Sequence, residues 1–217
     1  MKGPTRTLAL AAGLAAALTL GTAFAVTPVP VALGPSSTLS VFGTSTMHAW
    51  TCTSVAPRIT VQHADASATN DLIALVKAGQ LGVVDVTVPV ATLHSEKAGL
   101  DKNMLKAMKA SQYPDVTVHL DKFTPSAGNA DTLKLKAEGT LTIAGSTKSV
   151  VLTGHMVAGD SGVWLTGEYR LQMSQYGIRP PTMLMGTIRV GDPVTIRYQL
   201  LLINRDAAGS PPATTGL

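Results

Sequence analysis

The chain has 217 residues, with 17 Lys and Arg against 13 Asp and Glu, two Trp, four Tyr, three Phe and one cysteine. A basic surplus this small, with so few aromatic side chains, does not suit phosphate neutralisation or base stacking, so we expect no nucleic-acid partner. The single cysteine, Cys52, cannot close an internal disulfide, so the fold must be held by packing.

The N-terminus has the order of segments typical of a secretory signal peptide. Lys2 and Arg6 precede an apolar run from Leu8 to Leu20, and Ala23-Phe24-Ala25 follow it. We therefore predict a cleaved signal peptide over residues 1–25 and a periplasmic or secreted product. Without Lys2 and Arg6 the chain carries 15 basic and 13 acidic residues. No later apolar run reaches the roughly 18–20 residues that span a bilayer.

The rest of the chain is interpreted as one domain with two irregular ends. Residues 26–37 hold three prolines and no charge, which predicts an extended linker. Residues 205–217 are small, polar and proline-bearing, which predicts a flexible tail. Residues 38–204 are left as the folded domain.

Apolar residues in this domain alternate with polar ones, the pattern of half-buried strands. Val84, Val86 and Val88 alternate with Asp85 and Thr87. The predicted strands are 38–43, 49–62, 84–90, 116–120, 133–143, 149–157, 163–173 and 194–202. Short glycine-bearing turns join several of them, so the sequence predicts an all-β fold, either a closed antiparallel barrel or a sandwich.

Residues 100–108 break the alternation and predict a short amphipathic helix. Leu100, Met104, Leu105 and Met108 lie on one side, and Asp101 falls within that apolar arc. Three lysines, Lys102, Lys106 and Lys109, gather on the other side. The lysine face is interpreted as a solvated surface or as a transient contact with an anionic membrane. A single helix between strands suits one mouth of a barrel.

Few motifs in the sequence indicate catalysis. There is no CxxC, CxxCH, HExxH, GxGxxG or P-loop, and Gly43-Thr44-Ser45-Thr46-Met47 lacks the last glycine of a nucleophile elbow. His48 and Cys52 have the spacing of one strand face, which would suit a Cys–His pair or part of a metal site. We favour the simpler interpretation, in which Cys52 is a small buried apolar residue.

Four motifs in this order resemble the YceI-like family of exported polyisoprenoid- and lipid-binding proteins. They are GTSTMHAW at 43–50, LDKNM through YPDVTV at 100–118, EGTLTIAGSTK at 138–148 and QYGIRPPT at 175–182. The resemblance covers roughly residues 38–203. It implies an eight-stranded, lipocalin-like antiparallel β-barrel with one short amphipathic helix near a barrel mouth, whose lumen holds a long isoprenoid or another amphiphile.

The resulting hypothesis is a non-enzymatic protein that sequesters or carries an isoprenoid lipid, a quinone or a similar amphiphile, with no other cofactor. The alternatives are an envelope interaction module with a filled core, and a lipid-ester hydrolase that uses His48 with Cys52 or Ser45. Lys106, Ser45 or His48 would meet the polar end of the ligand. The predicted ligand-binding residues are Ser45, His48, Trp50, Val86, Val88, Leu100, Met104, Met108, Leu135, Tyr169, Leu171, Ile196 and Tyr198.

Overall fold

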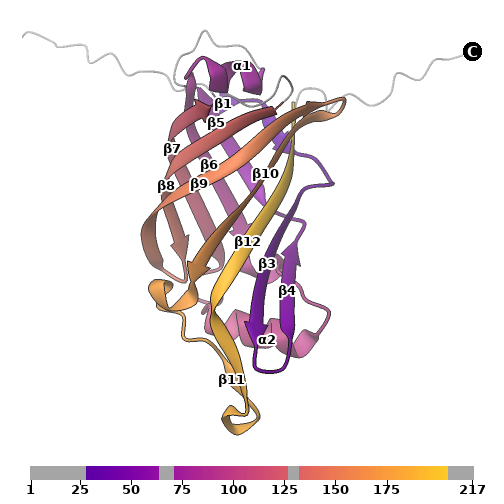
Figure 1. The fold of residues 1–217 in the computed structure, drawn as a ribbon, viewed down its shortest axis with the longest axis vertical. Helices are drawn as coiled ribbons and strands as arrows, with labels where there is room; N and C mark the ends of the chain where they lie inside the picture. The colour runs from indigo at the N-terminus through magenta and orange to yellow at the C-terminus, as the bar shows by residue number, and fades with distance from the viewer. Residues whose placement is uncertain (1–27, 64–70, 127–131, 205–217) are drawn as a thin grey trace, which may run out of the picture.

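The computed structural model describes residues 28–63, 71–126 and 132–204. They form a curled, antiparallel sheet of 12 strands with a helix at each end (Figure 1). The strands are β1 (Pro28–Val29), β2 (Val31–Leu33), β3 (Thr38–Ser45), β4 (Ala49–Ser54), β5 (Arg58–His63), β6 (Leu81–Pro89), β7 (Asp115–Ser126), β8 (Thr132–Ile143), β9 (Ser146–Gly159), β10 (Gly162–Gln172), β11 (Thr182–Met183) and β12 (Ile188–Asn204). The predicted signal peptide and the predicted tail lie outside the described residues.

The all-β, antiparallel prediction is confirmed, but the count of eight strands is not. Hydrogen-bonded neighbours follow the order β1-β5-β6-β7-β8-β9-β10-β12-β3-β4. The predicted strand 49–62 is divided into β4 and β5 by a turn at Pro57, which has no N–H to donate to a ladder. Ser54 helps to form this turn, because its Oγ accepts a hydrogen bond of 3.2 Å from the Ala56 N–H. The remaining difference comes from the very short strands β1, β2 and β11.

Residues 28–33 are part of the sheet, which corrects the prediction of a linker over 26–37. β1 pairs with β5 in the register Val29↔Val61, and β2 pairs with β12 in the register Leu33↔Leu202. The two strands are separated only by Pro30, so one short segment joins two strands that are distant in the sheet order. The side chains of Val29 and Val31 are buried. Alternating valines make this segment a strand despite its prolines.

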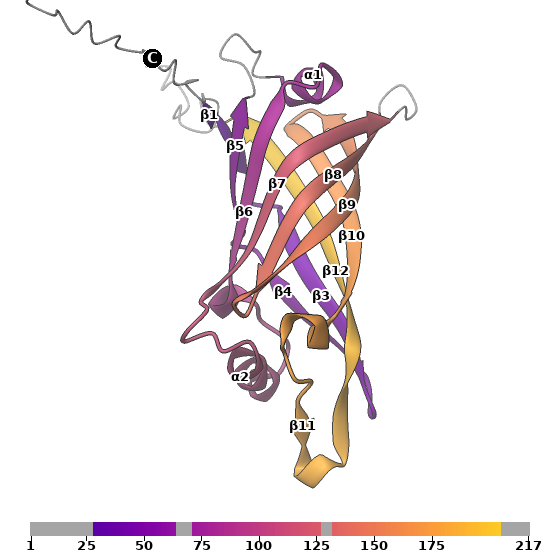
Figure 2. The ribbon, with the colours of Figure 1, turned by 90° about the vertical axis from the view of Figure 1, so that its left-hand side faces the viewer.

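Helix α1 (Leu72–Lys77) covers one end of the curled sheet and was not predicted from the sequence (Figure 2). It begins after Asp71, whose side chain caps it by accepting hydrogen bonds from the N–H groups of Ile73 (3.0 Å) and Ala74 (3.2 Å). Its buried side chains join an apolar core that we call the α1 cluster. That cluster consists of Val29, Val31, Ile59, Val61, Leu72, Leu75, Val76, Leu81, Leu133, Leu135, Met156 and Leu202.

Helix α2 (Ala98–Ala107) lies at the opposite end, where the sequence predicted a helix over 100–108 (Figure 2). Three short 3₁₀ turns complete the described structure: η1 (Val90–Thr92), η2 (Met173–Tyr176) and η3 (Leu184–Gly186). At the α2 end, β11 pairs with the start of β12, and this hairpin projects beyond the rest of the sheet (Figure 1). The two ends therefore differ: α1 packs on the α1 cluster, whereas Ala107 and Met108 of the α2 segment pack on a second apolar cluster, beside a protruding hairpin.

Candidate ligand-binding cavity

A cavity of about 280 Å³ lies inside the curled sheet between the α1 cluster and α2. All thirteen residues predicted to bind a ligand line it. They are Ser45, His48, Trp50, Val86, Val88, Leu100, Met104, Met108, Leu135, Tyr169, Leu171, Ile196 and Tyr198. Alternation places the strand residues of this set on the interior face, while α2 and its C-cap contribute Leu100, Met104 and Met108. Their binding role stays a prediction. Lys106 is not among the lining residues and is exposed, so it does not reach the cavity.

Many further aliphatic side chains share this lining but were not named from the sequence. They include Leu39, Val41, Ile59, Val84, Leu93, Val116, Val118, Leu120, Leu141, Ile143, Leu152, Leu165, Ile178, Ile188, Val190, Val194 and Leu200. Most lie at alternate positions of strands that were predicted, so the same period of two could have identified them. Ile178 and Ile188 lie around the projecting hairpin, whose course the periodicity does not indicate.

The cavity ends where the α1 cluster begins. Ile59 and Leu135 belong both to the cluster and to the cavity lining. Beyond them, Leu75 and Val76 of α1 are almost fully buried, with exposed fractions of 0% and 1%. A long apolar molecule would therefore meet a packed floor at the α1 end, and we expect it to enter from the α2 end.

The turn between β3 and β4 forms part of the α2 end of the cavity. His48 is the one exposed residue in the cavity lining. The Ser45 hydroxyl lies 2.9 Å from the His48 carbonyl oxygen, to which it donates, and it accepts from the His48 N–H at 3.2 Å. Trp50 follows, and its indole N–H donates to the Thr44 carbonyl oxygen at 3.1 Å. The polar groups of this turn are thus largely used to hold its own shape.

The half-buried Tyr198 lines the cavity, and the buried Tyr176 lies in the apolar cluster beside it. The Tyr198 hydroxyl donates to the Thr153 carbonyl oxygen at 2.9 Å, and burial raises the pKa of Tyr198 to about 12. Burial, together with the neighbouring Tyr169, also raises the pKa of Tyr176 to about 12. Both phenols therefore stay protonated at neutral pH, and they add no negative charge beside the apolar lining.

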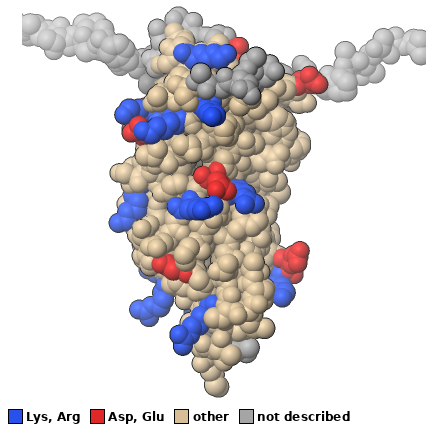
Figure 3. All heavy atoms as spheres, viewed as in Figure 1, with Lys and Arg blue, Asp and Glu red and all other residues tan. Residues whose placement is uncertain are grey.

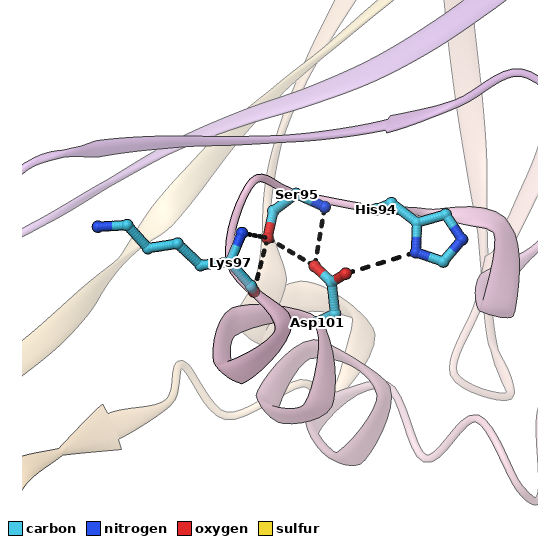
Figure 4. Close-up of polar contacts among 4 residues, drawn as sticks. All are labelled: His94, Ser95, Lys97 and Asp101. Atoms are coloured by element: carbon cyan, nitrogen blue, oxygen red, sulfur yellow. Dashed lines mark hydrogen bonds and ion pairs between the residues drawn. The ribbon is translucent and has the colours of Figure 1, made fainter.

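Asp101 connects α2 to the segment that follows η1 (Figure 4). Its Oδ1 accepts hydrogen bonds from the Ser95 N–H at 2.8 Å and from the Ser95 hydroxyl at 2.6 Å. Its Oδ2 lies 3.4 Å from Nδ1 of His94. This explains a charged residue within the apolar arc of the helix. Hydrogen bonds from Ser95, followed by the influence of His94, hold the pKa of Asp101 below its ordinary value.

We expect the contribution of Asp101 to stability to depend on pH. Because the pKa of its carboxyl is lower in the folded chain than the value of about 3.9 in an unfolded one, that contribution is complete above about pH 5 and is lost as the pH falls through the folded pKa. Asp101→Asn should lower the free energy of unfolding by about 1–2 kcal/mol at pH 7 and by less at pH 3. Urea unfolding of both proteins across this range measures the difference.

Asp160→Asn is the matched control for this experiment, since Asp160 lies exposed in the turn between β9 and β10. It should leave the unfolding free energy within about 0.5 kcal/mol of the parent protein. A penalty for Asp101→Asn that is the same at pH 7 and pH 3 would contradict the role given to the Asp101 carboxylate.

The arrangement of Cys52 and His48 does not support a catalytic pair. Strand β4 begins at Ala49, so His48 lies in the preceding turn and the two residues do not share a strand face as predicted. Cys52 has an exposed fraction of 0% and does not line the cavity. Burial, aided by the charge of Asp101, raises the pKa of Cys52 to about 11, so its thiol is protonated at neutral pH. Within residues 28–63, 71–126 and 132–204, no three His, Cys, Asp or Glu side chains gather as a metal site requires.

A second hollow of about 490 Å³ lies on the outer face of β3, β9, β10 and β12. Its lining is largely polar and includes Glu168 and Arg197, whose side chains approach to 3.5 Å. The guanidinium of Arg197 lies 4.8 Å from the centre of the Phe42 ring. These side chains are already paired with one another, and the inner cavity is the better candidate for an apolar ligand.

Comparison with known proteins agrees with the resemblance noted in the sequence. The YceI-like domain matches residues 35–202, which is most of the chain. The protein belongs to the YceI-like family. No curated protein matches the sequence. This YceI-like chain is similar in structure to BcnA of Burkholderia cenocepacia, with 18% identity and a TM-score of 0.59 over 76% of this chain and 95% of that one.

A second similar structure is the polyisoprenoid binding domain from Saccharophagus degradans that is implicated in plant cell wall breakdown. It shares 10% identity with this YceI-like chain, with a TM-score of 0.57 over 81% of this chain and 99% of that one. At these identities the two likenesses establish the fold. The curled sheet thus has the same fold as these two structures. The likeness does not extend to the identity of the residues around the cavity.

Proposed function

We propose that this protein is an exported, non-enzymatic binding protein that sequesters or carries an isoprenoid lipid, a quinone or a similar amphiphile. In this proposal the curled sheet acts as a lipocalin-like barrel and the cavity holds the apolar part of the ligand. The observation that carries the proposal is the cavity itself: about 280 Å³ of space surrounded by aliphatic side chains and bounded by a packed floor.

The energetics of such a cavity favour an apolar chain. Each CH₂ group that moves from water into an apolar environment contributes about 0.8 kcal/mol, before the cost of ordering the ligand. The volume of about 280 Å³ is close to the lower end of the range of about 300–1,000 Å³ for small-ligand sites. It would suit one isoprenoid or quinone tail of moderate length, or the first part of a longer chain.

The polar groups at the α2 end support a ligand with one polar end. Ser45, His48 and Asn103 line this part of the cavity, and tyrosines lie farther in. A site that is apolar throughout, with a few polar groups at one end, is the usual arrangement for binding an amphiphile. The buried, protonated Cys52 and the Ser45 hydroxyl committed to its own turn speak against the hydrolase alternative. The cavity speaks against an interaction module with a filled core.

The experiment is mass spectrometry of an organic extract from protein purified without detergent. We expect an amphiphile with an isoprenoid or quinone tail, in a molar ratio near one to the protein. The matched control is protein denatured and washed with organic solvent before refolding, which should yield no amphiphile. If the native protein yields no such molecule, and farnesol does not bind to the refolded protein either, the carrier proposal is wrong.

A further inference from the structure

We propose that the α2 end of the molecule docks on anionic phospholipid bilayers, with Met47 and Met185 inserted among the lipids. We call these two side chains the docking tips. The inference extends the proposed function, because a carrier of a water-insoluble lipid has to meet a membrane to load or release it. The partner of the α2 end is a lipid surface. Among the described residues, no helix is both long and apolar enough to cross a bilayer.

The docking tips stand out because they are exposed. Met47 has an exposed fraction of 67% and Met185 one of 108%. Among the described residues the large exposed apolar side chains are these two together with Val55 and Val151. Methionine is flexible and polarisable, so it adapts readily to a lipid interface. An exposed apolar side chain at the tip of a turn adds nothing to the core and is available to a partner.

The two tips come from separate parts of the chain that hydrogen bonds hold together. Met47 lies in the turn between β3 and β4, and Met185 lies in η3 at the end of the projecting hairpin. The Thr46 N–H donates to the Arg189 carbonyl oxygen at 2.9 Å, and the Thr46 hydroxyl donates to the Thr187 carbonyl oxygen at 3.2 Å. The two turns therefore form one rigid edge, so insertion would not require them to be ordered first.

The backbone at Met185 has a conformation that methionine rarely adopts, as it also has at Lys109 and Ala144. Its φ of 52° and ψ of 33° put it in the left-handed region. Glycine or asparagine is the usual residue in that region, because a side chain there costs stability. A methionine in this conformation, fully exposed, contradicts local preference and brings no packing in return. Such departures are expected at functional sites.

Basic side chains accompany the docking tips. Lys102 and Lys106 on α2, Lys109 just after it, Arg179 and Arg189 are all exposed at this end. In the part of the chain that the structure describes, none of these five forms an ion pair, whereas Lys122 and Lys136 on the sheet wall both pair with Glu138. On the face drawn in Figure 3, basic side chains lie beside the projecting hairpin, and the visible part of its tip is uncharged. Arg189 Nε donates to the Gly186 carbonyl oxygen at 3.2 Å and so lies against η3. Cations that no carboxylate pairs with, placed around an apolar tip, complement an anionic lipid surface.

The docking tips are placed to serve the cavity. Both views show α2 and the projecting hairpin at the same end of the molecule, opposite α1 (Figures 1 and 2). His48, next to Met47, lines the cavity, and so do Ile188 and Val190 at the base of the hairpin. An amphiphile leaving past these residues would enter the bilayer directly. At the opposite end, the described residues of the α1 cluster are packed together.

The test is co-sedimentation of the full protein with vesicles of phosphatidylglycerol and phosphatidylcholine, and with vesicles of phosphatidylcholine alone. We expect binding to the anionic vesicles that weakens with added salt. Met47→Ser with Met185→Asn should weaken it by about tenfold or more, since burial of two apolar side chains is lost. Asparagine suits the left-handed conformation, so this variant keeps its fold. Lys102→Gln, Lys106→Gln and Lys109→Gln together should weaken binding to the anionic vesicles by about a hundredfold.

Matched controls come from the sheet wall. Val151→Ser removes an apolar side chain that is also exposed, and Lys134→Gln removes an exposed charge, both away from the α2 end. Neither should change vesicle binding by more than about twofold. An environment-sensitive thiol dye on Met185→Cys should shift to the blue with anionic vesicles, while the same dye on Val151→Cys should not. The buried Cys52 leaves the introduced thiol as the reactive one.

The outcomes separate this inference from the proposed function. The docking inference is wrong if the parent protein does not bind anionic vesicles. It fails as well if the sheet-wall variants at Val151 and Lys134 lose as much vesicle binding as the variants at the docking tips. It is also wrong if the tip substitutions abolish self-association instead, since the edge would then contact a second copy of the chain. Vesicle binding by protein that neither yields an extractable amphiphile nor binds farnesol would overturn the carrier proposal alone. Extractable amphiphile without vesicle binding would overturn the docking inference alone.

Discussion

Gly139→Ala is expected to lower the free energy of unfolding by about 2–3 kcal/mol. Gly139 lies in β8 opposite Leu120 of β7, next to an irregularity in the pairing between Leu120 and Lys122. A Cβ at this position would overlap the carbonyl oxygen of His119 and lie 2.8 Å from Cα of Leu120. These are backbone atoms, so relief requires the two strands to separate rather than a side chain to rotate. Urea or thermal unfolding of the parent and variant proteins measures the change.

Gly99→Ala is the matched control, because it makes the same chemical change with no such contact. A Cβ on Gly99 meets nothing within 4 Å, and the residue lies in α2, where alanine is favoured over glycine by up to about 1 kcal/mol. The control should leave stability unchanged or raise it slightly. Equal stability of Gly139→Ala and Gly99→Ala would show that β7 and β8 do not approach as closely as the structure has them.

The sheet could be predicted from the sequence wherever burial is one-sided. In β6 and β12 the interior face is aliphatic and the outer face is polar, so Val84, Val86 and Ile196 alternate with Asp85, Thr87 and Arg197. The same rule placed the predicted residues of β6, β8, β10 and β12 around the cavity, whereas Leu100, Met104 and Met108 came from the helical pattern. Period two identifies a face without knowledge of the partner strand, and this is why the lining could be found before the strand order was known.

The sequence was least informative where partners distant in the chain decide the structure. Val29 and Val31 lie in strands because β1 pairs with β5 and β2 pairs with β12. Nothing in the local sequence indicates those pairings. Helix α1 left a recognisable signal, a capping Asp71 followed by Leu72, Leu75 and Val76 at helical spacing, but six residues are too few for a clear period. At the α2 end, the spacing of His48 and Cys52 suits a Cys–His pair on one strand face. In the structure the turn after Ser45 places His48 outside strand β4.

Asp101 illustrates a residue whose role only the folded chain shows. In the sequence Asp101 interrupts the apolar arc of the predicted helix, so it weakens the prediction of an amphipathic helix. In the structure it accepts two hydrogen bonds from Ser95, and so attaches α2 to the segment after η1. That segment in turn reaches β4, since His94 and Thr53 exchange backbone hydrogen bonds of 2.8 and 3.0 Å. The helix is thus tied to the free edge of β4, so the α2 end keeps its shape beside the cavity.

Ile196→Trp is expected to lower the amount of bound amphiphile about tenfold or more while the protein still folds. Ile196 lies on β12 between Tyr169 of β10 and Val41 of β3, and all three side chains line the cavity. An indole at this position would project into the space of about 280 Å³ and narrow it. Ile196 is only partly buried because it faces this space, so the larger side chain has room, and the overpacking cost should stay at the low end of about 1–3 kcal/mol.

The position of the substitution decides whether this experiment tests the cavity or only the core. Leu135 also lines the cavity, but it is part of the α1 cluster with an exposed fraction of 8%, so Leu135→Trp would disturb packing as well as binding. Gln199→Trp is the matched control, since Gln199 is on the same strand but points to the outer face. Farnesol titration and mass spectrometry of extracts should show loss of binding for Ile196→Trp alone. A folded Ile196→Trp protein with undiminished occupancy would mean that the ligand lies elsewhere, because an indole and an isoprenoid tail cannot share the same volume.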